Sequence, residues 1–370
     1  MQRRSFLKKA GLGLAAGAAA APAIVKAQSP TVSWRMAGSW PKSLETLYGG
    51  MEQISKRVSE ATGGKFNIKV FAAGEIVGGL QVLDAVQNGT VECGHTAAYY
   101  YFGKDPTFAL SCAVPFGPNS RQQNAWMYWG GGKELLREVY KGYNCMQFAA
   151  GNTGTQMGGW FRKEIKTLND LKGLKFRISS YAGLVLTKLG VVPQTIAGGD
   201  IYPALEKGTI DGAEWVGPYD DEKLGFYKVA KYYYYPGWWE GGPELDLLVN
   251  IKAWEALPKE YQAILEAACA EANVSMLAKY DTLNPPALKR LLANGVQLRP
   301  FSNEIMAACY KAANEVAAEI SAKNPQFKKV FDAMVKFRND QVQWFSVAEN
   351  RYDNFMIAAE RLSQRAPKKK

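Results

Sequence analysis

The chain contains a single histidine, His95, among its 370 residues. A histidine-rich zinc site and the HExxH motif of metalloproteases are therefore excluded, and any serine–histidine pair would depend on this one residue. The sequence also lacks a GxSxG nucleophile motif, a Walker loop, an EF-hand loop and a dinucleotide-binding glycine pattern at the start of a helix. These absences remove the common catalytic classes, and we interpret His95 as a structural residue.

Cysteine is scarce, and its spacing does not favour a metal cluster, because no two cysteines form a close CxxC pair. In an oxidising compartment the five cysteines could form two bridges and leave one free thiol. Buried free thiols are the alternative, since each cysteine is flanked by apolar or small residues. The cysteines are Cys93, Cys112, Cys145, Cys269 and Cys309.

Beyond the first 27 residues, no run is long and apolar enough for a membrane helix. The start itself resembles a twin-arginine export signal: Arg3-Arg4 is followed by a small, apolar run that ends at Ala23. Cleavage after Ala27 would begin the mature chain at Gln28, with no cysteine there to carry a lipid anchor. We expect a protein of the periplasm, exported by the twin-arginine route, without direct membrane insertion.

The positive charge is concentrated at the ends of the chain. Five basic residues and no acid lie in the leader, so the net charge falls from +11 to +6 on cleavage, and three of the remaining lysines are residues 368–370. No basic stripe of the kind that binds phosphates runs through the rest, so nucleic acid is not an expected partner. A mildly basic protein does draw anions into its clefts.

The alternation of short strands and amphipathic helices predicts an α/β fold with a parallel sheet. In the first half, strands are expected at residues 32–37, 66–71, from 91, and at 145–150, and helices at 44–61, 80–86 and 121–140. A second set comprises strands at 175–179, 191–195 and 213–216 and helices at 181–189 and 201–207. The loops after such strands form the binding crevice of an open sheet.

About 340 residues are too many for one ordinary core, which favours two domains. The segment Gly151–Gly154 is read as a first crossing between them, and a strand at 245–251 as the return. Two crossings predict interleaved domains, joined by hinge strands, in a clamshell that closes on its ligand. The expected division is a leader, 1–27; domain I, 31–151 plus about 244–300; domain II, 152–243 plus about 301–328; and a long C-terminal helix, 329–364.

The C-terminal third is predicted to be helical. Residues 259–294 form one candidate helix, in which Pro285-Pro286 forces a kink or a break. Residues 330–362 carry an apolar stripe and, as one helix, would be about 50 Å long, beyond the roughly 30 Å of a small domain. Either this helix bends around its own domain, or it is an arm that packs on a second copy to form a homodimer.

Three segments carry side chains suited to a binding site. Arg177 lies among apolar residues of a short strand, where a guanidinium either grips a carboxylate through two hydrogen bonds or forms a structural ion pair. Asp200 is expected to cap the following helix, and Glu214 to begin a strand that faces the crevice. Glu240 follows two tryptophans and precedes two glycines at the end of the aromatic run 232–242.

Together, the segment Leu171–Arg177, the stretch Gly199–Gly212 and the glycine-bounded first crossing resemble the DctP-family extracytoplasmic receptors of tripartite ATP-independent periplasmic (TRAP) transporters. The resemblance covers essentially the whole mature chain. The leader and the residues Gln156, Arg177, Glu214-Trp215 and Glu240 fit the branch that binds α-keto acids. The resemblance therefore implies a solute-binding protein, not an enzyme, that delivers pyruvate, 2-oxobutyrate or a similar 2-oxo monocarboxylate to membrane permease subunits.

In that branch the substrate binds together with a metal cation. The resemblance implies that Arg177 holds the substrate carboxylate and that Tyr101 and Asn152 donate hydrogen bonds to the ligand. The cation ligands implied are the Gln156 side-chain oxygen, the Trp215 carbonyl, and the carboxylates of Glu214 and Glu240. All are hard oxygens, which sodium and calcium prefer.

Charge counting gives separate support for a cation. One arginine, two glutamates and a substrate carboxylate sum to −2, which is severely unfavourable in a dry cleft. Calcium would neutralise this sum and sodium would leave −1; we take sodium first, as the keto-acid branch implies, and calcium second. The alternatives are a calcium-dependent receptor for lactate, another carboxylate or a sugar acid and, more remotely, a periplasmic hydrolase with Glu214 and Glu240 as acid and base.

Overall fold

Two separate β-sheets position the rest of the chain in the computed structural model, which describes residues 30–178 and 180–365. The export leader and the terminal lysines lie outside the described residues, and from Val32 onward the chain forms one contact unit. Within the described residues, no helix combines the length and apolar character needed to cross a bilayer. The α/β class and the two-lobed architecture predicted from the sequence are confirmed.

The first sheet combines strands from the start and the middle of the chain. Strand β1 runs parallel to β2 and β3, whereas β10 inserts antiparallel between β3 and β4. Its order is β2 (Phe66–Phe71), β1 (Val32–Gly38), β3 (Cys93–Thr96), β10 (Glu244–Asn250) and β4 (Cys145–Asn152). Since β10 follows every strand of the second sheet except β11, the chain leaves the first sheet after β4 and returns to it at β10.

The second sheet carries the segments with chemical interest. Strand β6 lies between β7 and β8 and runs parallel to both, which brings the chain after β6 and the chain after β8 to one edge. The order is β11 (Gln297–Pro300), β9 (Tyr232–Tyr235), β5 (Gly159–Phe161), β8 (Gly212–Ala213), β6 (Lys175–Arg177) and β7 (Val192–Gln194).

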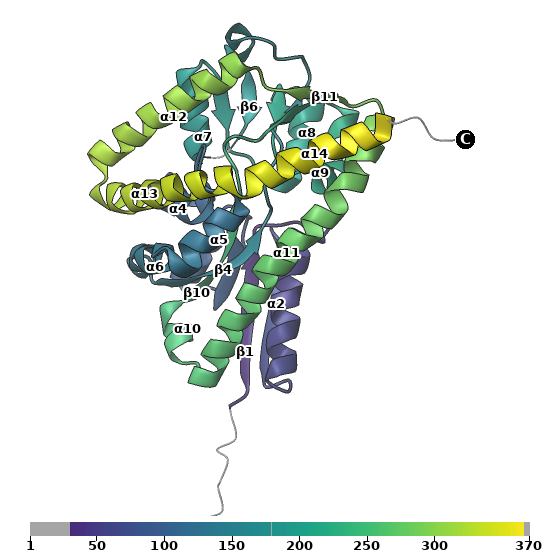
Figure 1. Ribbon diagram of the computed structural model, residues 1–370. Helices are drawn as coiled ribbons and strands as arrows, with labels where there is room; N and C mark the ends of the chain where they lie inside the picture. Colours follow the sequence, from purple (N-terminus) through teal and green to yellow (C-terminus); the bar gives the residue numbers. More distant parts are fainter. Residues whose placement is uncertain (1–29, 179, 366–370) are drawn as a thin grey trace, which may run out of the picture. The chain divides into compact units, whose positions relative to one another are not determined.

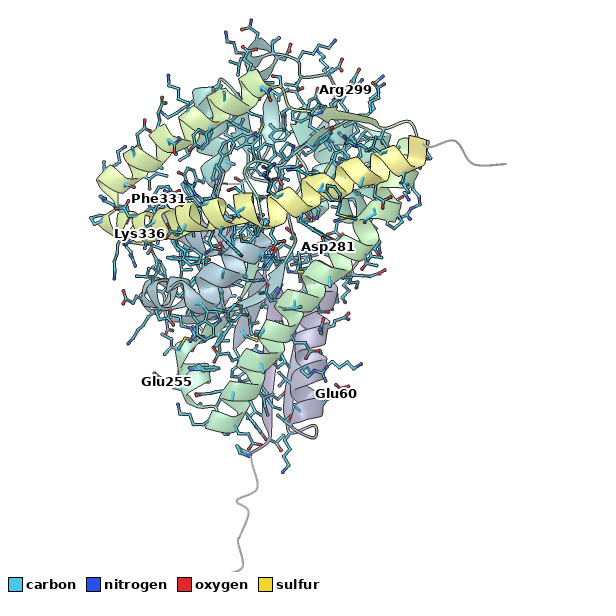
Figure 2. The ribbon with its side chains drawn as sticks, in the orientation of Figure 1. Glu60, Glu255, Asp281, Arg299, Phe331 and Lys336 are labelled. Carbon is cyan, nitrogen blue, oxygen red and sulfur yellow. The ribbon has the colours of Figure 1, made fainter. Side chains whose placement is uncertain are left out.

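Helices cover both sheets, and one of them joins the two lobes. Helix α11 packs on α2 and β4 of the first lobe and on α9 of the second; Figure 1 shows it crossing between them. Figure 2 labels Glu255, which lies just before α11, and Arg299, which lies just after it on β11. The two residues mark opposite ends of the segment that contains α11. The longer helices are α2 (Leu47–Ala61), α3 (Val82–Gln87), α5 (Ser120–Trp129), α6 (Gly132–Lys141), α7 (Ser180–Lys188), α8 (Gly198–Glu206), α9 (Pro218–Leu224), α11 (Lys259–Ala293), α12 (Asn303–Lys323), α13 (Pro325–Val347) and α14 (Glu349–Arg365).

The short elements complete the framework. They are α4 (Ala109–Cys112), α10 (Ile251–Glu255) and the 3₁₀ turns η1 (Ala98–Tyr101), η2 (Pro106–Phe108), η3 (Leu168–Leu171) and η4 (Phe226–Lys228). The five cysteines are free and buried in this structure.

Three predicted helices differ from those observed. The helix expected at 121–140 is two helices, because Gly131 has a φ of 86° and a left-handed residue cannot continue an α-helix. Helix α11 continues through Pro285-Pro286 without a break, held by packing on α2, β4 and α9, so of the two expected outcomes the break is wrong and the kink stays a prediction. The C-terminal helix divides into α13 and α14 at Ala348, whose φ and ψ are both −88°.

Two local predictions near the site also need correction. Asp200 does not cap its helix: α8 begins at Gly198 with Ala197 as its N-cap, so Asp200 lies within the first turn, where its charge suits the helix dipole. Glu214 does not begin a strand, because β8 ends at Ala213. Helix α12 lies in the region predicted to be helical but was not given bounds of its own, although Ser302 caps it by accepting a hydrogen bond from the Ile305 amide at 3.2 Å.

A buried aspartate connects the two lobes directly. Asp220 at the start of α9 accepts hydrogen bonds from the Thr46 hydroxyl, which precedes α2, and from the Tyr280 hydroxyl of α11, both at 2.6 Å. The Asp220 side chain is fully buried. Burial raises its pKa to about 6, although both hydroxyl groups oppose the shift.

We predict that Asp220→Asn flattens the dependence of stability on pH. An exposed aspartate ionises near pH 4, so between pH 4 and 6 the folded protein holds a proton that the unfolded chain has released. The stability contributed by the protonated carboxyl is present below pH 4 and is lost as the pH rises through about 6, on the order of 2 kcal/mol. Urea unfolding at pH 4 to 7.5 should show a shallower decline for the variant than for the wild type.

The exposed Asp353 of α14 supplies the matched control. Asp353→Asn should keep the wild-type slope. Equal slopes for Asp220→Asn and wild type would show that Asp220 is ionised in the folded protein throughout this range.

Candidate functional site

Arg177 ends strand β6 and is only 2 % exposed. Its Nε donates to the Ile196 carbonyl at 3.1 Å, and its Nη1 donates to the Glu214 carbonyl at 2.9 Å and to the Glu214 carboxylate. The guanidinium also lies over the Trp215 ring, 5.1 Å from its centroid. Burial acts to lower the pKa of Arg177, but the Glu214 carboxylate and nearby tyrosines raise it above its usual value, so the side chain is charged.

Glu214 follows β8, beside Arg177 on β6, and its amide donates to the Arg177 carbonyl at 3.2 Å. One carboxylate oxygen, Oε1, is bound by Arg177. The other, Oε2, is buried without a hydrogen-bond partner among the described residues. Burial raises the pKa of Glu214 to about 7, and Arg177 opposes this shift only in part.

Gln156 and Glu240 meet where the β4–β5 and β9–β10 connections run between the sheets; a third connection, through α11, joins β10 to β11. The Gln156 backbone N–H donates to the Glu240 backbone carbonyl at 3.1 Å, and the side chains of both residues are buried. The Gln156 side chain faces Trp215 O and Glu240 Oε2. With its nitrogen on that side, Gln156 donates to Trp215 O at 2.6 Å and to Glu240. With its oxygen on that side, three oxygens face one another, and a cation or a proton on Glu240 would stabilise them.

Glu240 adds a second acid to the cluster without a second positive charge. Burial and the neighbouring Glu214 carboxylate raise the pKa of Glu240 well above its usual range. One guanidinium faces two carboxyl groups in this interior, so the cluster would carry −1 if both were ionised, and the raised pKa favours a proton on the second acid until a cation takes its place. This competition between a proton and a cation is the main electrostatic property of the site.

The expected cation ligands therefore come together, as a set suited to a hard cation. The candidate ligand atoms of Gln156, Glu214, Trp215 and Glu240 are all oxygens. Glu214 supplies a carboxylate oxygen without a hydrogen-bond partner among the described residues, and Gln156 contacts Trp215 and Glu240. In the described part of the chain, no group of three or more His, Cys, Asp or Glu residues could hold a metal. The donor set thus fits sodium or calcium and does not resemble a zinc or copper site.

The structure does not bring Tyr101 to this cluster. Its hydroxyl accepts from the Leu83 amide at 3.1 Å and is bonded to the Thr96 hydroxyl at 2.7 Å, in the core of the first lobe. The preceding tyrosines of the η1 turn occupy the expected place, with Tyr99 bonded to Glu240 and Tyr100 to Arg177. The triple-tyrosine motif indicated the segment, but not which ring points to the site.

Asn152 lies at the end of β4 with both ends of its amide engaged. Its nitrogen donates to the Gly242 carbonyl at 3.1 Å, and its oxygen accepts from the Gly154 amide at 2.9 Å. These bonds fasten the two connecting segments to each other. Asn152 therefore holds the backbone of the site in this structure.

His95 has the structural role expected from the sequence. The Trp40 indole donates to His95 Nδ1 at 2.8 Å, which leaves Nε2 to donate to the Ala150 carbonyl at 3.2 Å. Burial lowers the pKa of His95 to about 4, so the ring is neutral. Trp40 in turn packs edge to face on Trp215, with centroids 6.4 Å apart, so His95 helps to position a ring that covers the site.

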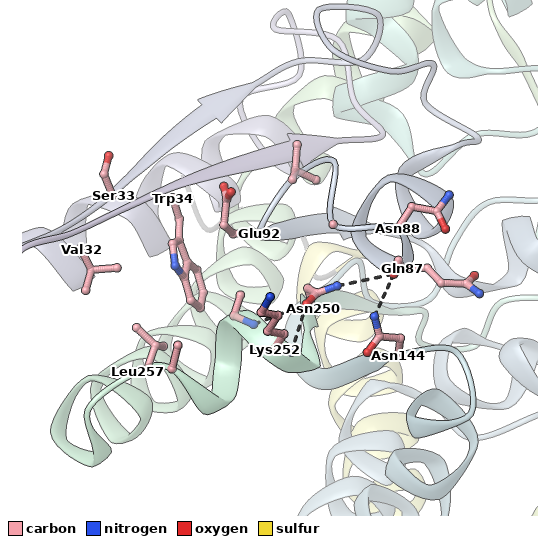
Figure 3. Close-up of a pocket in the computed structure, with 14 residues that line it drawn as sticks. Val32, Ser33, Trp34, Gln87, Asn88, Glu92, Asn144, Asn250, Lys252 and Leu257 are labelled. Carbon is pink, nitrogen blue, oxygen red and sulfur yellow. Dashed lines mark hydrogen bonds between the residues drawn. The ribbon is translucent and has the colours of Figure 1, made fainter.

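The site is closed in this structure. Beside Glu240, which is part of its wall, lies a small cavity of about 10 Å³ with both polar and apolar lining; the other lining residues are Tyr99, Ala113, Pro115, Ile178, Tyr181, Ala182 and Trp239. Hollows of about 620 and 630 Å³ lie elsewhere. Figure 3 shows the first of these, where Asn144 and Asn250 donate to the Gln87 carbonyl; none of the predicted site residues lines it.

Two α/β lobes joined by crossing strands, with buried charged side chains between them, define a binding protein that encloses a small ionic ligand. The family model for bacterial extracellular solute-binding protein family 7 (DctP) matches residues 36–324. This protein belongs to that family, and it is a solute-binding receptor of the TRAP type rather than an enzyme.

Similar proteins cover nearly the whole chain. A monocarboxylate 2-oxoacid-binding periplasmic protein of Nostoc sp. is 52% identical over 97% of this chain and 100% of its own. A TRAP solute-binding protein of Bordetella bronchiseptica, a mixed-occupancy dimer with copurified calcium and picolinate, is 54% identical with a TM-score of 0.89, over 90% of this chain and 99% of that one.

Two further structures contain pyruvate. The TRAP protein of Colwellia psychrerythraea, with calcium and pyruvate, is 38% identical, and that of Pseudoalteromonas atlantica, with sodium and pyruvate, is 39% identical. Each has a TM-score of 0.85 and covers 88% of this chain and 99% of its own.

We predict that Glu240→Gln stabilises the ligand-free protein while weakening its response to ligand. The substitution removes a buried carboxylate that lies beside a second one, a gain of about 1 kcal/mol or more. Thermal unfolding after chelation should show a higher Tm for the variant, with a smaller further rise on adding pyruvate and sodium. The exposed Glu52→Gln is the control, and a lower ligand-free Tm for Glu240→Gln would refute the repulsion.

Proposed function

We propose that this protein captures a small 2-oxo monocarboxylate, such as pyruvate or 2-oxobutyrate, together with a metal cation in the periplasm and delivers it to a TRAP membrane permease. The observation that carries the proposal is the buried cluster of one guanidinium and two carboxylates beside a Gln156 amide that faces acceptor oxygens. A similar chain that covers nearly its whole length is named as a 2-oxoacid-binding protein. The twin-arginine leader, outside the described residues, is proposed as its export signal.

Arg177 is the residue that holds the substrate carboxylate in this proposal. Its guanidinium is buried and fixed by backbone carbonyls on two sides, so it is oriented before a ligand arrives. In this structure the Glu214 carboxylate pairs with it. An entering carboxylate therefore competes with Glu214 for the same charge, and Glu214 is then available to a cation.

The proposed cation ligands are Gln156, Glu214, Trp215 and Glu240. When bound, the cation offsets the negative charge of the glutamates and of the substrate. With the substrate included, the ionised groups sum to −2, so sodium leaves −1 and calcium leaves zero. We propose sodium first and calcium second; the two similar pyruvate-containing structures hold one each.

The small cavity beside Glu240 favours a short, apolar substituent on the substrate. Ala113, Ile178 and Ala182 supply apolar surface there, beside Glu240, and the space is about 10 Å³. A sugar acid would bring several hydroxyl groups to a small space whose wall is partly apolar, where not all of them would find hydrogen-bond partners. Lactate remains the nearest alternative, because it has the same length and differs at one oxygen.

Entry requires the lobes to separate, because Arg177, Glu214 and Glu240 are each less than 5 % exposed. We propose that the moving bodies follow the expected division, 31–151 plus about 244–300 against 152–243 plus about 301–328. The bond from Thr46 to Asp220 and the packing of Trp40 on Trp215 are the contacts that opening would break.

The test of the substrate is a titration of the dialysed, chelator-treated mature protein with pyruvate, with sodium, with calcium and with neither. Trp215 and Trp239 lie at the site, so saturable quenching of tryptophan fluorescence that needs a cation is expected. A response to lactate or a sugar acid alone would keep the receptor and replace the substrate. No response to any carboxylate would overturn the proposal.

For Arg177→Lys we predict that pyruvate affinity falls about 10- to 100-fold, because one ammonium cannot replace the oriented guanidinium. Isothermal titration with sodium present measures the change, and circular dichroism checks the fold. Arg57→Lys, in an exposed ion pair with Glu271, is the matched control and should bind normally. Unchanged affinity in Arg177→Lys would remove Arg177 from the substrate site.

We also propose that α14 packs on a second copy to form a homodimer. In the described residues, the helix makes its main contacts with α13 only. Its exposed apolar side chains recur at helical spacing, and a similar receptor forms a dimer. The stripe comprises Tyr352 (64 % exposed), Phe355 (69 %), Met356 (38 %) and Leu362 (69 %).

Phe355→Asp combined with Leu362→Asp should therefore produce a monomer, since two charges in an apolar interface cost several kcal/mol. Sedimentation velocity at micromolar concentration measures the change. Val274→Asp, at an equally exposed valine of α11, is the control and should leave the dimer intact. A wild-type protein that sediments as a monomer would contradict the proposal.

A further inference from the structure

A buried aspartate contacts the segment that supplies two of the candidate cation ligands. Asp221, in the first turn of α9, is only 1 % exposed. Its Oδ1 accepts a hydrogen bond from the Val216 backbone N–H at 3.2 Å. Its Oδ2 accepts from the Trp160 indole of β5 at 2.9 Å and from the Tyr233 hydroxyl of β9 at 2.7 Å. Asp221 therefore joins two strands of the second sheet to the chain that follows β8.

The surroundings of Asp221 suit an ionised carboxylate. Three neutral donors serve its two oxygens, and a carboxylate only accepts hydrogen bonds. Lys223, two residues further along the chain, pairs with Glu45 instead, at 2.7 Å. Burial raises the pKa of Asp221 to about 7, against the effect of its three donors, so the side chain is ionised at mildly alkaline pH.

The N–H that Asp221 holds belongs to the same peptide unit as the Trp215 carbonyl. This peptide is trans, so its N–H and its C=O point in opposite directions. A carboxylate that fixes the N–H on one side therefore directs the carbonyl oxygen to the other side, where it lies 2.6 Å from the Gln156 side chain. One peptide plane thus connects Asp221 to a candidate cation ligand, with no side chain between them.

The carbonyls on either side of Trp215 are bound by protein donors. The Glu214 carbonyl accepts from Arg177 Nη1 at 2.9 Å, and the Val216 carbonyl accepts from the Met157 N–H at 3.0 Å. The carbonyl between them is the one that faces the cluster. The three peptide units are therefore each fixed by a different partner, and Asp221 is the partner of the unit that carries the candidate ligand.

The bond from the Val216 N–H also affects the charge on the Trp215 oxygen. A hydrogen bond to an ionised acceptor is stronger than one between neutral groups, and hydrogen bonds in series polarise one another. Negative charge at the N–H end of a peptide therefore increases the negative charge on its carbonyl oxygen, which favours a hard cation. Outer partners of this kind orient the ligands of metal sites and strengthen them.

We propose that Asp221 is a positioning residue of the cation site, which orients and polarises the Trp215 carbonyl without contacting the cation itself. This inference rests on the proposed function and deepens it, because it assigns a residue that sets cation affinity. Arg177, the proposed partner of the substrate carboxylate, is not bonded to Asp221. Cation affinity should therefore depend on Asp221 much more strongly than the affinity for substrate at saturating cation does.

The first test observes this peptide alone, since Trp215 is the only tryptophan in the chain that is followed by valine. Protein labelled with carbonyl-¹³C tryptophan and ¹⁵N valine gives a single NMR signal for that bonded pair. In the chelated wild type at mildly alkaline pH, the Val216 amide proton should resonate downfield of ordinary amides, as an N–H bound to a carboxylate does. An ordinary position in the wild type would overturn the proposal without any variant.

The second test measures cation affinity through the shift of the Trp215 carbonyl carbon on titration with sodium and with calcium. Asp221→Asn should move the Val216 proton upfield and weaken cation binding about 10- to 100-fold. Calorimetry at saturating sodium should show a much smaller change in pyruvate affinity. Tyr233→Phe, which removes a different bond to the same carboxylate, is the matched control: it should lower Tm and keep the wild-type cation affinity.

The outcomes separate this proposal from the cation site on which it rests. A wild-type carbonyl carbon that responds to neither cation would overturn both. A wild-type response together with equally tight cation binding in Asp221→Asn would leave the cation site in place and overturn the role of Asp221. Equal weakening in Asp221→Asn and Tyr233→Phe would do the same, because it would make Asp221 a general support of the fold.

Discussion

The ion pair of Arg177 with Glu214, next to the unpaired Glu240, is the interaction on which the rest of the structure depends. Buried ion pairs seldom stabilise a fold, because desolvation offsets their attraction, and a second carboxylate beside such a pair is unfavourable. The arrangement persists because the surrounding lobes fix it. The site thus contains one more acid than Arg177 can neutralise, and a bound cation is what allows that acid to ionise, so a cation and an anion bind together.

The fold places these groups with few elements. The parallel pairing of β6 with β8 sets Arg177 beside Glu214, and the β4–β5 and β9–β10 connections bring Gln156 to Glu240. Each lobe therefore contributes rigid edges, while the residues that contact ligand follow the strand ends. Trp40 of the first lobe packs on Trp215 of the second, so closing excludes water where the charges are least compensated.

Much of this arrangement could be predicted from the sequence, and the failures have physical causes. Strand β2 was located to the residue, since its alternation is strong and Gly63-Gly64 precedes it. The break between α5 and α6 was not predicted, because any of the three glycines at 130–132 could have continued a helix. Only the left-handed φ of Gly131 shows that the helix ends there. For the site, the segments were recognised by resemblance, but the 3₁₀ turn after β3 decides that Tyr99 and Tyr100, rather than Tyr101, face the charges.

Buried acids are hard to predict from a local pattern. Asp220 and Glu244 stand in ordinary sequence surroundings, and only Glu240 is marked by its tryptophan and glycine neighbours, yet burial raises the pKa of all three. They differ in what meets them: hydroxyl groups for Asp220, a second carboxylate for Glu240, and one amide with unpartnered oxygens for Glu244. Since carboxylates that lack a fixed positive partner make stability depend on protons and cations, the stability of this receptor should report the ionic composition around it, as a receptor that takes up an anion with a cation requires.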